Sequence, residues 1–159
     1  MRPLFAAIVL CIFATLSVHA ADPQGFAIWK PADFQSKEKM LDEKIGADHS
    51  ARETLGQYGS HMVRMIHRVA TGAPEFHADF VDLWIIESGR GSVVVGGTLS
   101  EPKPMGQGHG EMTGSGISGG ESHEIAAGDV IHIPANTPHW AVVPKGGQLT
   151  YLRIAIPVK

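Results

Sequence analysis

The stretch GDVIHIPANTPHW (residues 128–140) decides the fold class of this chain. Gly128 and Asp129 form a turn signal, in which the aspartate is expected to accept a hydrogen bond from a backbone N–H. They precede residues 130–133, which are rich in β-branched side chains. Residues 134–138 carry two prolines and an asparagine, typical of a tight connection, and His139 begins another β-rich run. Two short strands joined in this way indicate antiparallel β structure.

Short β-rich runs with Gly, Pro and Asn between them continue through the second half of the chain. The chain has 159 residues, of which 19 are Gly and 10 are Pro, and this spacing predicts an all-β sandwich or barrel. The further runs are residues 62–69, 81–87, 91–95, 140–143 and 149–156. Residues 100–123 are Gly-rich and poor in large apolar side chains, which predicts a long connecting loop with one short strand near Ile117.

A second informative stretch is GAPEFHADFVDLWIIESGRG (residues 72–91). Glu75 and His77 are two positions apart, so in a strand both side chains point to the same face. Asp82, Trp84 and Ile86 likewise share one face of the following run. If both faces are inward, two carboxylates and an imidazole meet in a pocket with one tryptophan wall. Unpaired buried charges cost several kcal/mol, and a divalent cation would offset that cost.

The stretch around His77 resembles the first sequence motif of the cupin superfamily. That motif runs Gly, five residues, His-x-His, three or four residues, Glu, six residues, Gly. In this chain His77 matches the second histidine and Gly89 the closing glycine. Glu75 stands at the first histidine, Asp82 stands at the glutamate, and Gly72 leads in after two residues instead of five.

The stretch around His139 resembles the second motif of the same family and is the stronger signal. That motif runs Gly, five residues, Pro-x-Gly, two residues, His, three residues, Asn. Gly128, Pro134 and His139 match it, whereas Asn136 replaces the second glycine and Val143 replaces the final asparagine. The resemblance covers roughly residues 60–157, and both motifs occur in the expected order.

The resemblance implies a jelly-roll-like β-barrel of two antiparallel sheets with a metal ion at one end of its interior. The family's usual ligands are three histidines and one glutamate, which become Glu75, His77, Asp82 and His139 here. A site of imidazoles and carboxylates suits Mn(II), Fe(II) or Zn(II) and offers no soft ligand for Cu(I). Two histidines and one carboxylate with open positions would also fit a non-haem iron oxygenase site.

Each candidate ligand also has a structural alternative. His77 and His139 could be hydrogen-bonded interior histidines, and Glu75 could form a salt bridge with Arg64 or Arg68. Asp82 is shorter than glutamate by one methylene, so it could instead hydrogen-bond groups around the metal. The candidates for lining a substrate pocket are Trp84, Ile86, His67 and His132. Arg64, Arg68 and Arg153 lie on predicted strands and could point inward, but they specify no substrate.

The first 20 residues read as a secretory signal peptide. Arg2 precedes an almost wholly apolar run, Leu4–Val18, which is followed by the small residues Ala20 and Ala21. This run is shorter than a membrane span needs. We expect cleavage there and a periplasmic or secreted protein. The remaining chain would have no cysteine, since Cys11 is the only one, and a net charge of −4. A mildly acidic chain without a basic cluster argues against nucleic acid and anionic membranes as partners.

The expected domain organisation is a signal peptide at 1–20, an extension with short helices at 21–59 and the barrel at 60–159. Within the extension, residues 32–45 carry a sparse apolar stripe with Asp33 as N-cap, and Ser50–Glu53 matches a capping box for a short helix to Leu55. Both helices are expected to cover a sheet.

Two functions remain open at this point. The first is a metal-dependent enzyme acting on a small molecule by dioxygenase-like, isomerase-like or hydrolase-like chemistry. The second is a non-catalytic cupin that binds a small ligand, with a structural metal or with none. A metal-free structural dimer is a third, weaker alternative. The fold hosts many functions, so resemblance does not choose among them, and it implies a homodimer as the expected assembly.

Overall fold

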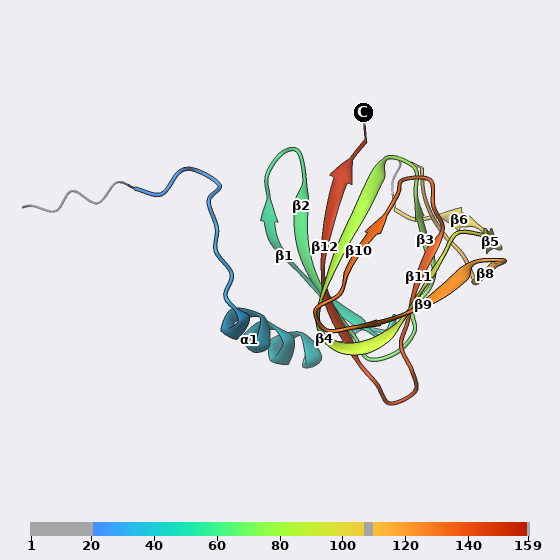
Figure 1. Cartoon of the computed structure of the whole chain (residues 1–159), viewed down its shortest axis with the longest axis horizontal. Coiled ribbons are helices and arrows are strands. Elements are labelled where there is room, and N and C mark those ends of the chain that lie inside the picture. Colours follow the sequence, from blue (N-terminus) through green and yellow to red (C-terminus); the bar gives the residue numbers. More distant parts are fainter. Residues whose placement is uncertain (1–20, 107–109, 159) are drawn as a thin grey trace, which may run out of the picture.

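The computed structural model describes residues 21–106 and 110–158. The expected signal peptide at 1–20 lies outside the described residues and stays a prediction. One helix, α1 (Pro31–Asp42), precedes a curled antiparallel β structure (Figure 1). The strands are β1 (Ser50–Gln57), β2 (Met62–Arg68), β3 (Glu75–His77), β4 (Phe80–Val95), β5 (Thr98–Ser100), β6 (Lys103–Pro104), β7 (Glu111–Thr113), β8 (Gly116–Ser118), β9 (Glu121–Ala126), β10 (Val130–Ile133), β11 (His139–Val142) and β12 (Leu149–Pro157).

Strand β4 holds the two halves of the barrel together. Its first half pairs with β12 and β10, in a sheet that continues through β2 to β1. Its second half pairs with β9 and β11, in a sheet that continues through β3 and β7 to β6. The expected barrel of two antiparallel sheets is therefore confirmed. The predicted break at residues 88–90 is wrong, because β4 runs through it as one strand.

Gly89 is the point where β4 passes between the two halves. Its φ is +81°, and a Cβ added there would lie 2.1 Å from the carbonyl oxygen of Gln148. Both facts exclude a side chain, because glycine alone adopts this conformation at low cost and leaves room for the neighbouring backbone. The sequence signal that suggested a turn therefore marks a bend inside a continuous strand.

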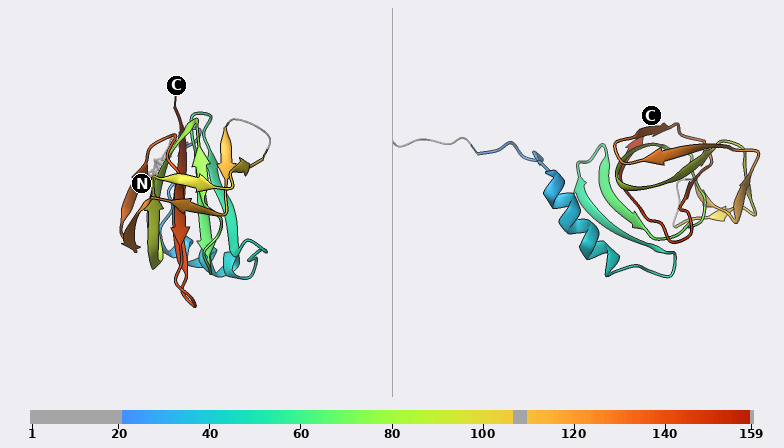
Figure 2. Two further views of the ribbon diagram at one scale, coloured as in Figure 1. Left: turned by 90° about the vertical axis from the view of Figure 1, so that its right-hand side faces the viewer. Right: turned by 60° about the horizontal axis from the view of Figure 1, so that its bottom comes forward.

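Helix α1 lies against the outer face of β1 and β2, on the side away from the barrel interior (Figure 2, right). Pro31 is suited to the first helical position. The N-cap is Lys30 and not Asp33 as predicted. Asp33 occupies the third helical position, where its carboxylate accepts a hydrogen bond of 2.8 Å from the Lys30 backbone N–H. The helix ends at Asp42, earlier than expected. Among the described residues, no helix is both long enough and apolar enough to cross a membrane.

The predicted second helix at residues 50–55 is wrong. These residues belong to β1, which pairs with β2 from Ser50↔Arg68 to Gln57↔Met62. The polar pattern that matched a capping box arises because the strand lies at the edge of the sheet. The sheet consequently begins at Ser50, ten residues before the expected start of the barrel at residue 60.

The expected loop at residues 100–123 also contains more strand than predicted. The short strand near Ile117 is confirmed as β8, which pairs with β5. Strands β6 and β7 add to the sheet beside β3, although they are only two and three residues long. Such short strands have no apolar periodicity to detect, because their backbone pairing depends on a neighbour distant in sequence.

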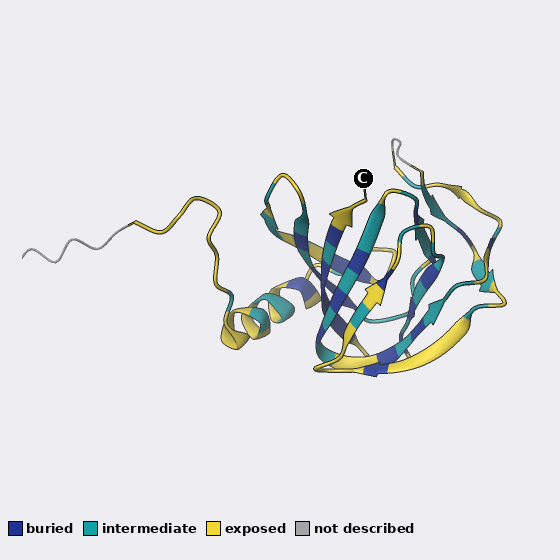
Figure 3. Cartoon of the chain, turned by 45° about the horizontal axis from the view of Figure 1, so that its top comes forward, coloured by how far each residue is buried: buried dark blue, intermediate teal, exposed yellow. Residues whose placement is uncertain are grey.

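Burial alternates along β4 and β11, which have an interior and an outer face, whereas consecutive residues of β2 and β12 are buried (Figure 3). The interior cluster includes Trp84, Ile86, Val93, Leu149 and Tyr151. A second cluster lies between α1 and the outer face of the sheet, formed by Leu41, Ala51, Met65 and Leu152.

Replacing Leu41 with alanine tests whether this second cluster fastens α1. Leu41 is the one α1 residue that is fully buried, and it packs with Met65 and Leu152. We expect Leu41→Ala to lower the free energy of unfolding in urea by about 2 kcal/mol, near the lower end for such truncations because a helix end can settle into the gap. Met40→Ala, at an exposed neighbour, is the control and should change it by less than about 0.5 kcal/mol. Equal effects of the two variants would contradict the packing role of Leu41.

Candidate metal centre

Strand register brings the candidate site together from residues distant in sequence. Glu75 lies opposite His139 in the pairing of β3 with β11, and His77 lies opposite Glu111 in the pairing of β3 with β7. Directly opposite residues of antiparallel strands project to the same side. Strand β3 therefore carries two site residues and gives each a partner on a different neighbouring strand.

Glu75, His77 and His139 form the metal-binding candidate group, called the trio below. Each residue offers a ligand atom, and these atoms lie within 4.8 Å of one another. Glu75 Oε2 and His77 Nε2 are 3.5 Å apart, close to the roughly 3.3–3.6 Å between ligands of a tetrahedral ion with bonds of about 2.0–2.2 Å. Both histidines are 3% exposed. The trio therefore needs only a small inward movement to hold one divalent cation.

Hydrogen bonding orients the His139 ring for coordination. Its Nδ1 is 3.0 Å from the carbonyl oxygen of Thr137, and because a carbonyl only accepts, Nδ1 is the protonated nitrogen. In the neutral ring Nε2 then carries a lone pair, and this atom is buried without a hydrogen-bond partner. His77 Nε2 is likewise buried and without a partner. Unsatisfied buried imidazole nitrogens are costly, and a metal ion would satisfy both.

The connection before His139 is tied to β3. The backbone N–H of Asn136 donates to the carbonyl oxygen of His77 at 2.8 Å. Asn136 replaces the glycine of the family motif, and its φ of +60° explains why, since asparagine tolerates the left-handed region better than other side chains. Asp129 accepts from the Ala126 N–H at 2.8 Å, as expected for its turn. Asn136 thus takes a left-handed conformation at the position of the motif glycine, and its backbone links this connection to β3.

Asp82 lies beside the trio but is bound to an arginine. Its Oδ2 accepts from Arg153 Nε at 2.7 Å and from Trp84 Nε1 at 3.4 Å. The same oxygen is 3.5 Å from His139 Nε2 and 3.7 Å from His77 Nε2. Burial opposes the charge of Asp82, but the contacts with His139 and Arg153 outweigh it and hold its pKa well below the usual value. Asp82 is therefore an ionised group next to the trio and not one of its three members.

Glu75 also has an arginine neighbour. Arg68 Nη2 is 3.8 Å from Glu75 Oε1, and Arg68 Nε donates to the Tyr151 hydroxyl at 3.1 Å. Burial alone would raise the pKa of Glu75, but the contacts with His77 and His139 and the charges of Arg68 and Arg153 lower it to about 2. The salt-bridge alternative for Glu75 and its place in the trio therefore occur together, because its two oxygens face different neighbours.

A pocket of about 190 Å³ opens next to the trio, called the mouth pocket below. Its polar lining includes Arg153, Glu111, His61 and Gln57. Arg153 contacts Asp82, and Glu111 Oε1 is 3.6 Å from His77 Nδ1. The mouth pocket is thus separated from the trio by Glu111 alone at one point and by Arg153 and Asp82 at another. Its lining residues are Gln57, Gly59, His61, Met62, Phe80, Glu111, Arg153, Ala155 and Pro157.

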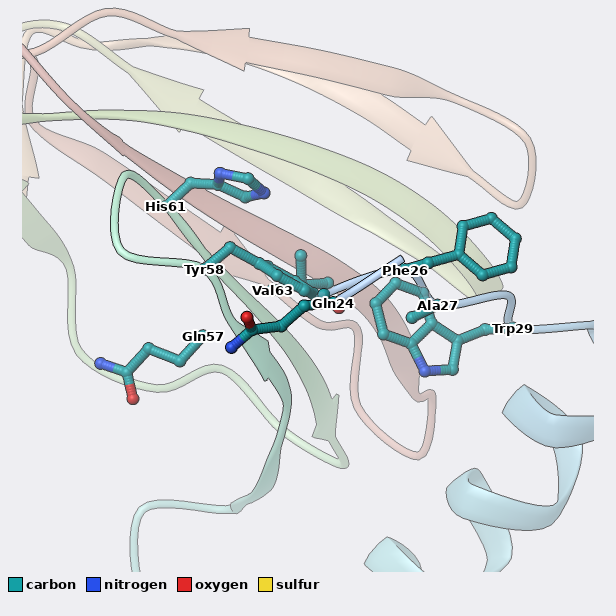
Figure 4. Close-up of a pocket in the computed structure, with 9 residues that line it drawn as sticks. Gln24, Phe26, Ala27, Trp29, Gln57, Tyr58, His61 and Val63 are labelled. Carbon is teal, nitrogen blue, oxygen red and sulfur yellow. The ribbon is translucent and has the colours of Figure 1, made fainter. Parts of the chain in front are cut away.

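A larger hollow of about 690 Å³ shares Gln57 and His61 with the mouth pocket and lies between the extended segment before α1 and the β1–β2 hairpin (Figure 4). Phe26 and Trp29 lie on one side of it, and Tyr58 and His61 lie on the other. His61 is the sole titratable side chain in its lining besides Tyr58. This hollow contains none of the trio and offers no cluster of ligating groups.

Of the four residues predicted to line a substrate pocket, two point into the barrel and two lie on its outer face. Trp84 and Ile86 point inward as expected, but each is 2% exposed and belongs to the core. His67 and His132 require correction. His67 faces α1, with Nδ1 2.8 Å from Thr150 Oγ1 and Nε2 3.4 Å from Asp42, and His132 is exposed on β10. Alternation along β2 and β10 places both on the outer face.

Sequence reasoning did not identify Glu111 and left Arg153 without a role. Glu111 lies in the Gly-rich region that was expected to be a loop, and only its pairing opposite His77 reveals it. Arg153 could have been found from its place in an otherwise apolar strand, because a buried arginine requires an acidic partner. That partner is Asp82, 71 residues earlier.

Known structures resemble this chain in fold. A protein from Bacillus halodurans is 16% identical, with a TM-score of 0.56 over 86% of this chain and 84% of that one. An uncharacterized double-stranded β-helix domain protein from Klebsiella pneumoniae is 17% identical, with a TM-score of 0.51 over 73% of this chain and 85% of that one. A cupin 2 conserved barrel domain protein from Rhodopseudomonas palustris is 21% identical, with a TM-score of 0.48 over 69% of this chain.

The chain spans 62% of the length of the Rhodopseudomonas protein, less than two thirds. Comparison with family models and with curated proteins found no match. The likeness in fold agrees with the observed barrel and with the order of the two motifs. The chain therefore has a double-stranded β-helix fold.

Proposed function

We propose that Glu75, His77 and His139 bind one divalent metal ion and that the protein is a metal-dependent enzyme acting on a small molecule. The observation that carries this proposal is the pair of buried Nε2 atoms of His77 and His139, which lack hydrogen-bond partners and lie beside a carboxylate. The nitrogen and oxygen donors suit Mn(II), Fe(II) or Zn(II).

The number of ligands favours catalysis over a purely structural metal. Structural zinc sites are closed by four protein ligands, whereas catalytic sites keep three and leave a position open. Asp82, the fourth ligand expected from the family resemblance, lies outside the trio and binds Arg153 through Oδ2, while its Oδ1 is buried without a partner among the described residues. When bound, the metal would polarise a ligand atom or activate water at the open position.

The surrounding residues have separate tasks in this proposal. Thr137 fixes the His139 ring through Nδ1, which leaves Nε2 available. Asp82 keeps Arg153 in place at the mouth pocket. Glu111 borders the same pocket, where its carboxylate can accept a proton from a bound molecule.

Metal analysis of protein purified without added metal tests this proposal. We expect close to one equivalent of Mn, Fe or Zn per chain, and loss of most of it in His77→Ala and in His139→Ala. Adding metal to a hundredfold excess over its Kd should stabilise the stripped protein by about 2.7 kcal/mol, which corresponds to a rise in melting temperature of roughly 5–10 °C.

His132→Ala is the matched control, because this exposed histidine lies outside the trio. It should retain the metal and the rise in melting temperature. A metal-free preparation whose melting temperature does not respond to Mn(II), Fe(II) or Zn(II) would overturn the proposal.

A further inference from the structure

Two arginines lie side by side at the mouth of the barrel. Arg64 on β2 and Arg153 on β12 are direct partners in the strand register, so their side chains project to the same face. Like charges directly opposite each other destabilise a sheet. Negative charge close to the pair would offset this repulsion.

The protein supplies only part of that negative charge. Arg153 Nε is bound to Asp82, but Arg153 Nη2 is buried and has no hydrogen-bond partner. Among the described residues, no carboxylate lies within 4.0 Å of the Arg64 guanidinium, whose Nη2 contacts the sulfur of Met62 at 3.4 Å. Burial and the charge of Arg153 lower the pKa of Arg64, as expected for a cation with too little compensation.

One of the two arginines lines the mouth pocket, and the other is its neighbour. Arg153 and Met62 both line it, and Arg64 is adjacent to each of them. On the other side, Glu111 connects the pocket to His77. A molecule in this pocket would therefore meet the Arg153 side chain and the Glu111 carboxylate directly, with Arg64 next to Arg153 in the strand register.

The charge balance favours an anion once a metal is bound. The cluster contains three arginines (Arg64, Arg68 and Arg153) and three carboxylates (Glu75, Asp82 and Glu111). These charges cancel, so a divalent cation leaves the cluster with an excess of two positive charges. We infer that the mouth pocket binds a small organic acid, with its carboxylate on the Arg64–Arg153 pair. This inference rests on the proposed metal-dependent function.

The pocket fits a carboxylate better than a phosphate. Its volume of about 190 Å³ is below the roughly 300 Å³ of drug-sized ligand sites, so the ligand is small. Glu111 lines the same space and would repel a phosphate dianion more than a monoanion. The carboxylate of Glu111 can instead accept a hydrogen bond from a hydroxyl group of the bound acid.

Titration calorimetry on the metal-loaded protein tests this inference with lactate and pyruvate as probes. Their neutral amides, lactamide and pyruvamide, have nearly the same shape and lack the charge. We expect the acids to bind at least tenfold more tightly than the amides. Arg64→Gln should weaken binding of the acids by about 10- to 100-fold, while metal content stays unchanged and the melting temperature does not fall, because Arg64 forms no ion pair.

Arg90→Gln is the matched control, since it removes the same charge from an exposed position in the middle of β4, next to Gly89 and outside the mouth pocket. It should leave the affinity for both acids unchanged. The inference is overturned if the amides bind as tightly as the acids, if inorganic phosphate binds more tightly than either acid, or if Arg64→Gln has no effect. Arg64-dependent acid binding in protein that takes up no metal would refute the proposed metal function alone. Normal metal uptake without acid binding would refute the carboxylate pocket alone.

Discussion

Replacing Asp82 with alanine should lower the free energy of unfolding by about 3–5 kcal/mol, a large share of the stability of an ordinary domain. Asp82 is 1% exposed, and its Oδ2 is the ion-pair partner of Arg153 Nε at 2.7 Å. Without the carboxylate, the arginine would remain buried with an uncompensated charge, and Trp84 Nε1 would lose its acceptor. Urea unfolding, followed by tryptophan fluorescence and by circular dichroism, measures the change.

Two further variants show whether the unpaired charge is the cause. Asp129→Ala removes a carboxylate whose one side-chain hydrogen bond, accepted from the Ala126 N–H, is exposed, and it should cost no more than about 1.5 kcal/mol. The double variant Asp82→Leu with Arg153→Met removes both charges and should recover most of the lost stability. If Asp82→Ala costs no more than Asp129→Ala, the ion pair is not a main support of the barrel.

Acid should destabilise the metal-free protein through Glu75. Its pKa is lowered from 4.5 to about 2, so in the unfolded chain it takes up a proton near pH 4.5, whereas in the folded protein it stays ionised. The stabilisation is fully present above pH 4.5, amounts to about 3 kcal/mol and is lost as the pH falls from about 4.5 to 2. The lowered pKa of Asp82 acts in the same direction.

Urea unfolding in the presence of EDTA between pH 6 and pH 3 measures this dependence. Glu75→Gln should lose less stability over that interval than the wild type, because it has no proton to gain. Glu121→Gln, at an exposed position on β9, should behave as the wild type does. Parallel pH curves for the wild type and Glu75→Gln would contradict the low pKa of Glu75.

The fold was predictable because its signals are local. The turn at Gly128, the prolines before His139 and the β-branched runs each identify a short strand or its end. The same local rules failed at Ser50, where a capping-box pattern belongs to an edge strand, and at β6 and β7, whose short strands depend on pairing with distant partners. Local patterns do not encode which strand lies next to which.

The site was predictable to the extent that it uses motif positions. His77, His139 and Glu75 meet as expected, but the binding partner of Asp82 could not be read from residues near it, because Arg153 is 71 positions away. For His67, the sequence does not tell which face of the sheet the side chain points to. A histidine in a strand points to one of two faces, and only the position of α1 reveals that this one faces outward.

The continuity of β4 has a consequence for folding. Its first half carries Asp82 and its second half pairs with β11, which carries His139. Neither sheet can come apart without disturbing a strand that belongs to the other. The barrel should therefore lose its structure in one cooperative step, and the metal ligands contributed by β3 and β11 should be assembled or dispersed together rather than one at a time.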